Sequence, residues 1–135
     1  LKYFLVMDFF QVIKICFKKY ADFSGRASRT EFWNFFAFLV ILQITFDFID
    51  SIILGVPYIE LNFWDGYLGN IFYILTFVPG ISVSARRLHD INKSGWWMLI
   101  VLTVIGSIPL IYWYCKKGED KANKYGPNSA VFKKT

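Results

Sequence analysis

The residues best suited to chemistry lie in one short stretch between two long apolar runs. Two adjacent arginines, Arg86 and Arg87, are followed by the only histidine, His89, and by Asp90. Adjacent arginines can hold a phosphate through charge-assisted hydrogen bonds, and a histidine beside a carboxylate can act as a general base. The more ordinary interpretation, which we favour, is that these residues anchor a helix end at a membrane interface and cap a turn.

Four further charged residues belong to the candidate sites. Arg26 and Arg29 precede the first long apolar run, and with the cluster at 86–90 they could bind a phospholipid headgroup or a partner protein. Asp47 and Asp50 lie within that run, three residues apart and therefore on one face of a helix. We interpret this acidic pair as the helix exit; the alternatives are a wet cavity on a proton or cation path, or a contact with another subunit.

Composition indicates a membrane protein. Of the 135 residues, 56% are apolar and 21% are aromatic, and a soluble domain of this size has too much surface for its volume to bury them. Residues 1–29 carry six Lys or Arg, residues 30–85 carry none, and residues 86–135 carry nine. Basic residues that flank apolar runs are typical of membrane anchoring rather than of nucleic-acid binding. We therefore expect a lipid bilayer with anionic phospholipid headgroups as partners, and no nucleic acid.

No cofactor, metal site or catalytic set is predicted. Cys16 and Cys115 lie far apart, and neither has a second thiol or a histidine nearby. They predict neither a disulfide nor a zinc site, and we interpret both as small apolar residues. The sequence also contains nothing like a nucleotide-binding loop or a haem ligand pair, so we expect a protein that is not an enzyme.

Hydropathy and spacing predict an all-α integral membrane protein with a single domain over residues 1–135. One helical face carries the polar residues Asp8, Gln11, Lys14 and Lys18, which predicts an amphipathic interfacial helix over 1–20. An ordinary amphipathic helix packed on the rest of the protein is the alternative. Ser28 and Glu31 have the spacing of a capping box. Apolar runs predict transmembrane helices at 32–54, 67–85 and 96–115, with a bend at Pro79-Gly80, and residues 116–135 form a polar basic tail.

Charge also bears on orientation. With three crossings, a cytoplasmic N-terminus leaves nine Lys or Arg inside and six outside, and the reverse orientation exchanges these numbers. The positive-inside rule therefore favours a multi-pass protein of the bacterial inner membrane with its N-terminus in the cytoplasm. Lys116 and Lys117 directly after the last run oppose this arrangement. The alternative is a re-entrant hairpin that turns at Gly106–Pro109 and brings all basic residues to one side.

Three segments resemble the bacterial domain-of-unknown-function family 805, the YhaH-like small inner-membrane proteins. They are Tyr20–Arg29 followed by Glu31-Phe32-Trp33, then Arg86–Asp90 with Ser94–Trp97, and finally the tail from Gly118 to Asn123 with Tyr125-Gly126-Pro127. The resemblance covers nearly the whole chain, and departs from the family at Lys116-Lys117 and Asn128-Ser129. It implies a multi-span membrane protein and supplies no activity.

The leading functional hypothesis is a non-enzymatic accessory or scaffolding subunit that associates with another membrane protein or with itself. One alternative is a small homo-oligomeric channel or transporter-like conduit, with Asp47 and Asp50 at its acidic mouth. Another is a phospholipid-headgroup-binding protein that uses Arg86, Arg87 and His89.

Overall fold

The computed structural model describes residues 2–62 and 65–129, and all regular secondary structure in these ranges is helical. The all-α prediction is therefore confirmed for this part of the chain. The elements are, in order, α1 (Lys2–Lys18), α2 (Arg29–Leu54), the 3-10 turn η1 (Tyr58–Glu60), α3 (Leu68–Asp90), the 3-10 segments η2 (Gly95–Leu102) and η3 (Val104–Gly106), and α4 (Ser107–Cys115).

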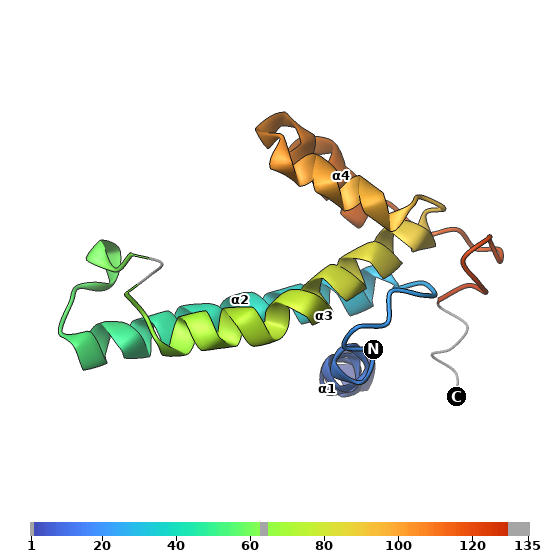
Figure 1. The fold of residues 1–135 in the computed structure, drawn as a ribbon. Coiled ribbons are helices and arrows are strands. Elements are labelled where there is room, and N and C mark those ends of the chain that lie inside the picture. Colours follow the sequence, from blue (N-terminus) through green and yellow to red (C-terminus); the bar gives the residue numbers. More distant parts are fainter. Residues whose placement is uncertain (1, 63–64, 130–135) are drawn as a thin grey trace.

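Two long antiparallel helices, α2 and α3, form the main arm of the molecule (Figure 1). With 26 and 23 residues they are about 39 and 35 Å long at ~1.5 Å per residue. Both are long and apolar enough to cross a bilayer; α2 covers the predicted run 32–54, and α3 covers the predicted run 67–85 from Leu68 onward. α3 continues beyond the predicted end through Asp90, with Pro79 inside it, and Figure 1 shows that this helix is bent.

The capping box at the start of α2 forms only in part. The Ser28 hydroxyl accepts a hydrogen bond from the Glu31 amide at 3.2 Å, as the spacing predicts. The reciprocal bond is replaced, because the Glu31 carboxylate accepts instead from Nη1 of Arg86 at 2.5 Å. The Glu31 carboxylate therefore does not cap its own helix; through its bond with Arg86 it joins α2 to α3.

Residues 96–115 do not form one transmembrane helix, and that prediction is wrong. The segment consists of η2, η3 and the nine-residue α4. In a continuous helix Trp97 and Trp113 would be separated by about 24 Å along the axis, whereas their ring centroids are 5.6 Å apart. The chain turns at Gly106, where a Cβ would overlap the carbonyl oxygen of Ile100. The result is an apolar helical hairpin (residues 95–115, "the hairpin").

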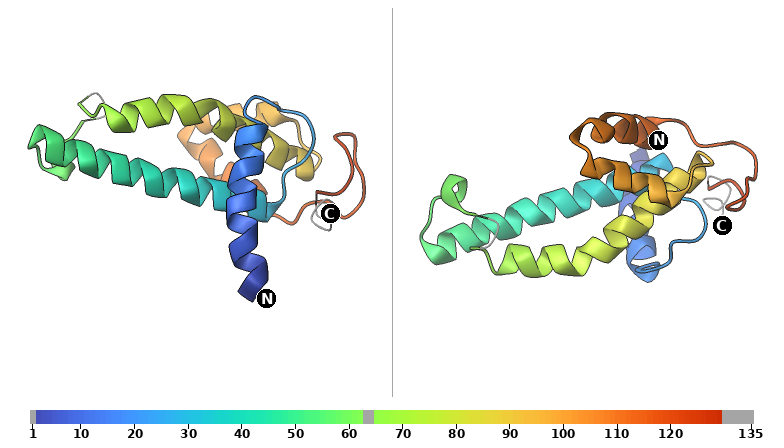
Figure 2. Two further views of the ribbon diagram at one scale, coloured as in Figure 1. Left: turned by 90° about the horizontal axis from the view of Figure 1, so that it is seen from below. Right: turned by 45° about the horizontal axis from the view of Figure 1, so that its top comes forward.

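α1 runs across the end of α2 rather than alongside it (Figure 2). Val12 and Cys16 are buried against the rest of the protein, and the ring of Phe17 makes an edge contact with Phe35. Lys14 and Lys18 are exposed, as predicted for the polar face, and so is Phe10, at 65% of its surface. α1 therefore has a protein-facing side, a polar side and an exposed apolar side.

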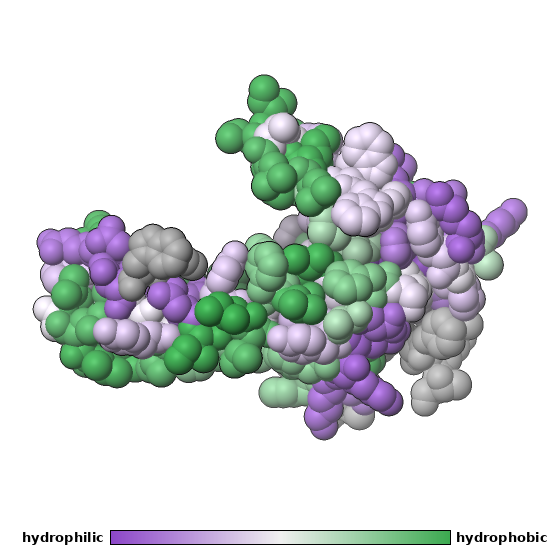
Figure 3. Space-filling model, in the orientation of Figure 1, coloured by the Kyte–Doolittle hydropathy of each residue, from purple (hydrophilic) through white to green (hydrophobic). Residues whose placement is uncertain are grey.

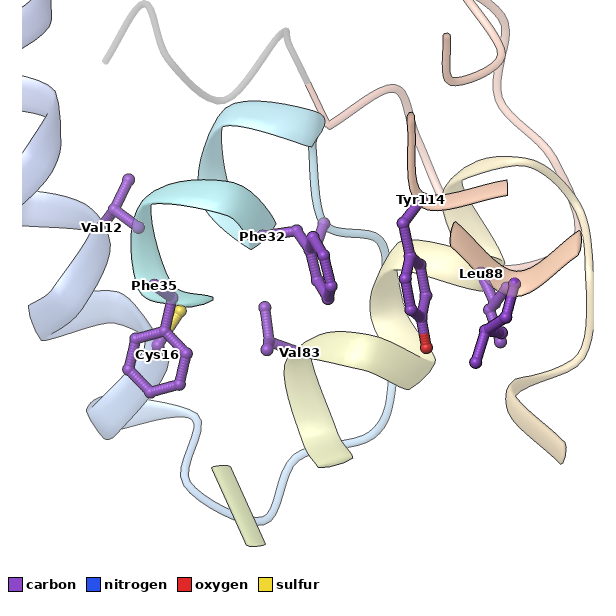
Figure 4. Packing of buried hydrophobic residues seen from close by; sticks show 9 residues of the cluster. Val12, Cys16, Phe32, Phe35, Val83, Leu88 and Tyr114 are labelled. Atoms are coloured by element: carbon purple, nitrogen blue, oxygen red, sulfur yellow. The ribbon is translucent and has the colours of Figure 1, made fainter. Parts of the chain in front are cut away.

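The buried core lies at one end of the arm, where α1, α2, α3 and α4 meet (Figure 4). Phe32 from α2 packs its ring 4.4 Å from that of Tyr114 on α4, and Phe35 and Val83 lie beside Cys16 of α1. This small core fixes the ends of the helices. It also brings together the charged residues that the sequence distributes between positions 26 and 90.

Candidate functional site

One buried carboxylate organises the charged end of the molecule. Asp90, the last residue of α3, is 3% exposed, and its two oxygens lie 2.9 Å from Nε of Arg26 and 2.6 Å from Nη1 of Arg87. The Ser129 hydroxyl donates a third hydrogen bond to it at 2.8 Å. We call Arg26, Arg87, Asp90 and the tail carbonyls that they bind "the clasp".

The clasp holds the tail against the end of α3. Arg26 donates through Nη1 to the carbonyl of Lys121 at 2.8 Å and through Nη2 to that of Glu119 at 2.5 Å. Arg87 donates to the carbonyl oxygens of Tyr114, at 3.1 Å, and of Lys116. The predicted polar tail is thus tied to buried side chains as far as residue 129, while residues 130–135 lie outside the described residues.

Two guanidinium groups share one carboxylate, so their remaining donors need other acceptors. Backbone carbonyls of the tail supply these acceptors, which is the condition under which buried charges are tolerated. The close approach requires Gly118, because a Cβ there would overlap Oδ2 of Asp90. The tail therefore completes the hydrogen bonding of α3 and is part of the fold.

A second buried ion pair lies beside the clasp. The guanidinium of Arg86, fully buried, donates to Glu31, and the Cys16 thiol approaches the same carboxylate with 3.9 Å between sulfur and oxygen. Nε and Nη2 of Arg86 have no hydrogen-bond partner among the described residues. Of the two pairings that the helical spacing allows for Asp90, Arg87 makes one and Arg86 turns to Glu31 instead.

His89 is held by the backbone and by an aromatic ring. Its Nδ1 lies 3.0 Å from the carbonyl oxygen of Gly25, and its ring stacks on Tyr125 with the centroids 3.9 Å apart. Both carboxylate oxygens of Asp90 are engaged by the clasp, so the His89-Asp90 pair of the sequence is not a base with a carboxylate behind it. Arg29 is exposed at the edge, with Nη1 at 3.4 Å from the carbonyl of Cys115.

The acidic pair lies at the opposite end of the arm, and its two members do different things. Asp50 is buried and accepts from the backbone amides of Leu68 at 3.1 Å and Gly69 at 2.9 Å, so it caps the start of α3 from the neighbouring helix. Asp47 is half-buried and accepts from Nε2 of Gln43 at 2.9 Å. The favoured interpretation as a mere helix exit understates Asp50, which ties α2 to α3.

Sequence reasoning missed several participants. It assigned Glu31 to the capping box alone, and it gave Ser129 and Tyr125 no partners. Cys16 is buried, as expected for a small apolar residue in the core, whereas Cys115 is exposed at the end of α4. Within the described ranges, no group of three His, Cys, Asp or Glu residues is placed to hold a metal ion. The one sequence signal for the close approach of the tail to Asp90 was Gly118, where a side chain would overlap that carboxylate.

Two long apolar helices, an apolar hairpin and a charged end held by the tail define a small helical membrane protein. Residues 20–127 match the family described as "Protein of unknown function (DUF805)", and the chain belongs to that family. It is 34% identical over 112 residues to "Inner membrane protein YhaH" of Escherichia coli strain K12, covering 82% of this chain and 89% of that protein. It is 36% identical over 110 residues to "Inner membrane protein YhaI" of the same strain, covering 81% and 86%. No solved structure matches it.

Proposed function

We propose that this protein is a non-enzymatic structural subunit of the bacterial inner membrane, which acts by associating with another membrane protein or with a second copy of itself. The observation that carries the proposal is the internal use of its charged residues. Arg26, Arg86, Arg87 and Asp90 are buried in ion pairs that hold the fold together. Catalysis or phosphate binding by these side chains would require them to be accessible to a substrate or ligand.

The surface left for association is apolar. Figure 3 shows hydrophobic residues over the hairpin and along the α2–α3 arm. Hydrophilic residues gather near the clasp and at the loop that joins α2 to α3. Large apolar side chains of the hairpin are almost fully exposed: Leu102, Val104 and Ile105 are 81%, 88% and 82% exposed. In a bilayer such a surface contacts acyl chains or other helices, and aromatic and aliphatic side chains pack well against either.

For topology, we propose two full crossings, by α2 and α3, with the hairpin re-entrant from the cytoplasmic side. Every Lys and Arg belongs to residues 1–29 or 86–135, and contacts of the clasp join residues from both segments. The hairpin returns the chain to the end from which it started, so these segments share one side. The positive-inside rule makes that side the cytoplasm.

α1 fits an interfacial position in this arrangement. It lies across the end of α2, so it would run along the membrane surface when α2 crosses the bilayer. Its exposed Phe10 would enter the acyl region, while Lys14 and Lys18 would face the headgroups.

Topology is tested with single cysteines in a Cys115→Ser background. Ile59 is 91% exposed in η1, and Lys121 is exposed in the tail. A membrane-impermeant maleimide is expected to label Ile59→Cys in intact cells and Lys121→Cys only after lysis. Labelling of both from outside would mean that the hairpin crosses the membrane, and would overturn the two-crossing arrangement.

Association is tested in the native membrane. A photo-crosslinking amino acid at Val104 or Ile108, both exposed on the hairpin, is expected to give one discrete adduct, either with a second tagged copy or with one other membrane protein. The matched control carries the same amino acid at Ile52, which is also exposed and lies near the far end of α2. Lipid adducts alone at all three positions, together with a monomeric native mass, would refute the proposal.

Anionic-lipid binding is a second candidate, favoured by the exposed lysines rather than by the buried arginines. Lys14, Lys18, Lys116, Lys117 and Lys121 are exposed at the basic end. Each lysine near an anionic surface contributes about 1 kcal/mol. Replacing Lys116 and Lys117 by Gln is therefore expected to weaken retention of phosphatidylglycerol, measured by native mass spectrometry. Equal retention by the double variant and the parent would exclude this role.

A further inference from the structure

A hollow of about 380 Å³ lies at the end of the arm opposite the clasp. It opens between α2, η1 and the start of α3, and this volume is within the range of small-molecule sites. Its described lining is mainly polar, and includes Gln43, Asp47, Tyr58, Asn62 and Asn70. None of the functional roles proposed above uses this hollow.

Asp47 is the acid of this hollow, and it has no basic partner among the described residues. Within residues 2–62 and 65–129 its one hydrogen bond comes from Gln43, and no Lys or Arg occurs anywhere between residues 30 and 85. A half-buried carboxylate near a membrane is costly unless enough hydrogen-bond donors or a cation accompany it. The Asp50 carboxylate accepts from two backbone amides at the start of α3. The Asp47 carboxylate has no such pair of donors among the described residues.

The fold makes room for the Asp47 carboxylate. A Cβ at Gly69 would overlap Oδ1 of Asp47, so only glycine at this position lets the carboxylate lie against α3. Two neutral amide side chains line the same hollow as Asp47: Asn62 donates through its amide nitrogen to Asp65, and Asn70 donates to the carbonyl of Gly66. Their amide oxygens accept no hydrogen bond within the part of the chain that the structure describes.

We infer that this hollow binds an ammonium group, with Asp47 as its counter-charge and the amide oxygens of Asn62 and Asn70 as further acceptors. An ammonium carries three donors and matches one carboxylate with neutral oxygens around it. The exposed ring of Tyr58 on the lining adds a face for a cation. The ammonium can belong to a phosphatidylethanolamine headgroup or to a soluble amine, and both sources share this chemistry.

The test uses the full chain in two arms. In the first, the protein is released from nanodiscs with equal phosphatidylethanolamine and phosphatidylglycerol, and native mass spectrometry counts the retained lipids. In the second, free ethanolamine is titrated against nanodiscs of phosphatidylglycerol alone, and saturation-transfer NMR detects binding. Asp47→Asn keeps the shape and the acceptor for Gln43 but removes the charge. It is expected to weaken ethanolamine-group binding about tenfold or more in whichever arm the parent binds.

Glu60→Gln is the matched control, since Glu60 is an exposed acid on η1 outside the lining of the hollow; its binding should equal that of the parent. Gln43→Lys tests the idea without removing the acid. A lysine four residues before Asp47 supplies an internal ammonium, so binding should be lost while the fold is kept. Binding in one arm alone identifies the source. Binding unaffected by both Asp47→Asn and Gln43→Lys, or absent from both arms, overturns the inference.

Discussion

Replacing Asp90 by Asn is the most direct perturbation of the clasp. The carboxylate is buried and accepts from Arg26, Arg87 and Ser129 at 2.9, 2.6 and 2.8 Å. Asn keeps one acceptor oxygen, but its amide nitrogen is a donor that faces another donor. Two guanidinium groups then stay buried with no anion between them. Breaking a buried pair in this way costs about 3–5 kcal/mol, which is a shift of at least 100-fold in the folding equilibrium.

The loss should appear first in the tail, because the same arginines hold its carbonyls. In the parent protein the backbone around Lys117 and Lys121 is tied to Arg87 and Arg26, so trypsin should cut it slowly. Asp90→Asn should release this segment and accelerate cleavage there in nanodisc-embedded protein. The unfolding midpoint in denaturant should fall in the same preparation.

Asp120→Asn is the matched control. Asp120 forms the exposed pair with Lys117 at 2.7 Å, where both side chains are about 70% exposed. Such a surface pair contributes about 0–1 kcal/mol, so cleavage and unfolding should hardly change. If Asp90→Asn resembled Asp120→Asn in both measurements, the clasp would not hold the tail, and the reasoning from burial would be refuted.

Three further predictions concern other contacts. Asp50→Ala should lower the free energy of unfolding by about 1–3 kcal/mol, because two amides at the start of α3 lose their acceptor. Denaturant titration in micelles measures this; an unchanged free energy of unfolding would mean that Asp50 does not stabilise the start of α3. Burial raises the pKa of the Cys16 thiol to about 12, so Cys16 should resist maleimide at pH 7–8 while exposed Cys115 reacts; mass spectrometry distinguishes them, and equal labelling would contradict the packing of α1. Gly118→Ala should loosen the tail towards trypsin as Asp90→Asn does, since its Cβ would overlap the Asp90 carboxylate; unchanged cleavage would mean that the tail can shift without loss.

The failure at residues 96–115 has a definite cause. The run has the length, the hydropathy and the aromatic ends of a transmembrane helix, and these properties are the same for one helix and for a hairpin. What distinguishes them is the contact between Trp97 and Trp113 and the tight turn at Gly106. Gly106 and Pro109 marked the turn in the sequence, but local signals of this kind do not say whether the chain bends slightly or reverses.

The charged residues illustrate the same limit. Helical spacing allowed Asp90 to pair with Arg86 or Arg87, and only Arg87 does so. Arg86 turns to Glu31, 55 residues earlier in the chain. Partners so distant in sequence depend on how α2 and α3 pack, and no local pattern encodes that packing.

The sequence by itself determined that this is a helical membrane protein, where its two long apolar helices lie, and that its basic residues gather in two terminal segments. These properties follow from composition and from local periodicity, which act within a few turns of chain. Only the tertiary structure decided that the last apolar run folds back, that the tail closes over a buried aspartate shared by two arginines, and that Asp47 borders a hollow while its neighbour Asp50 caps a helix. Each of these depends on contacts that local periodicity does not encode: apolar packing and a tight turn fold the last run back, and the cost of desolvating buried charge selects the partners of the charged groups.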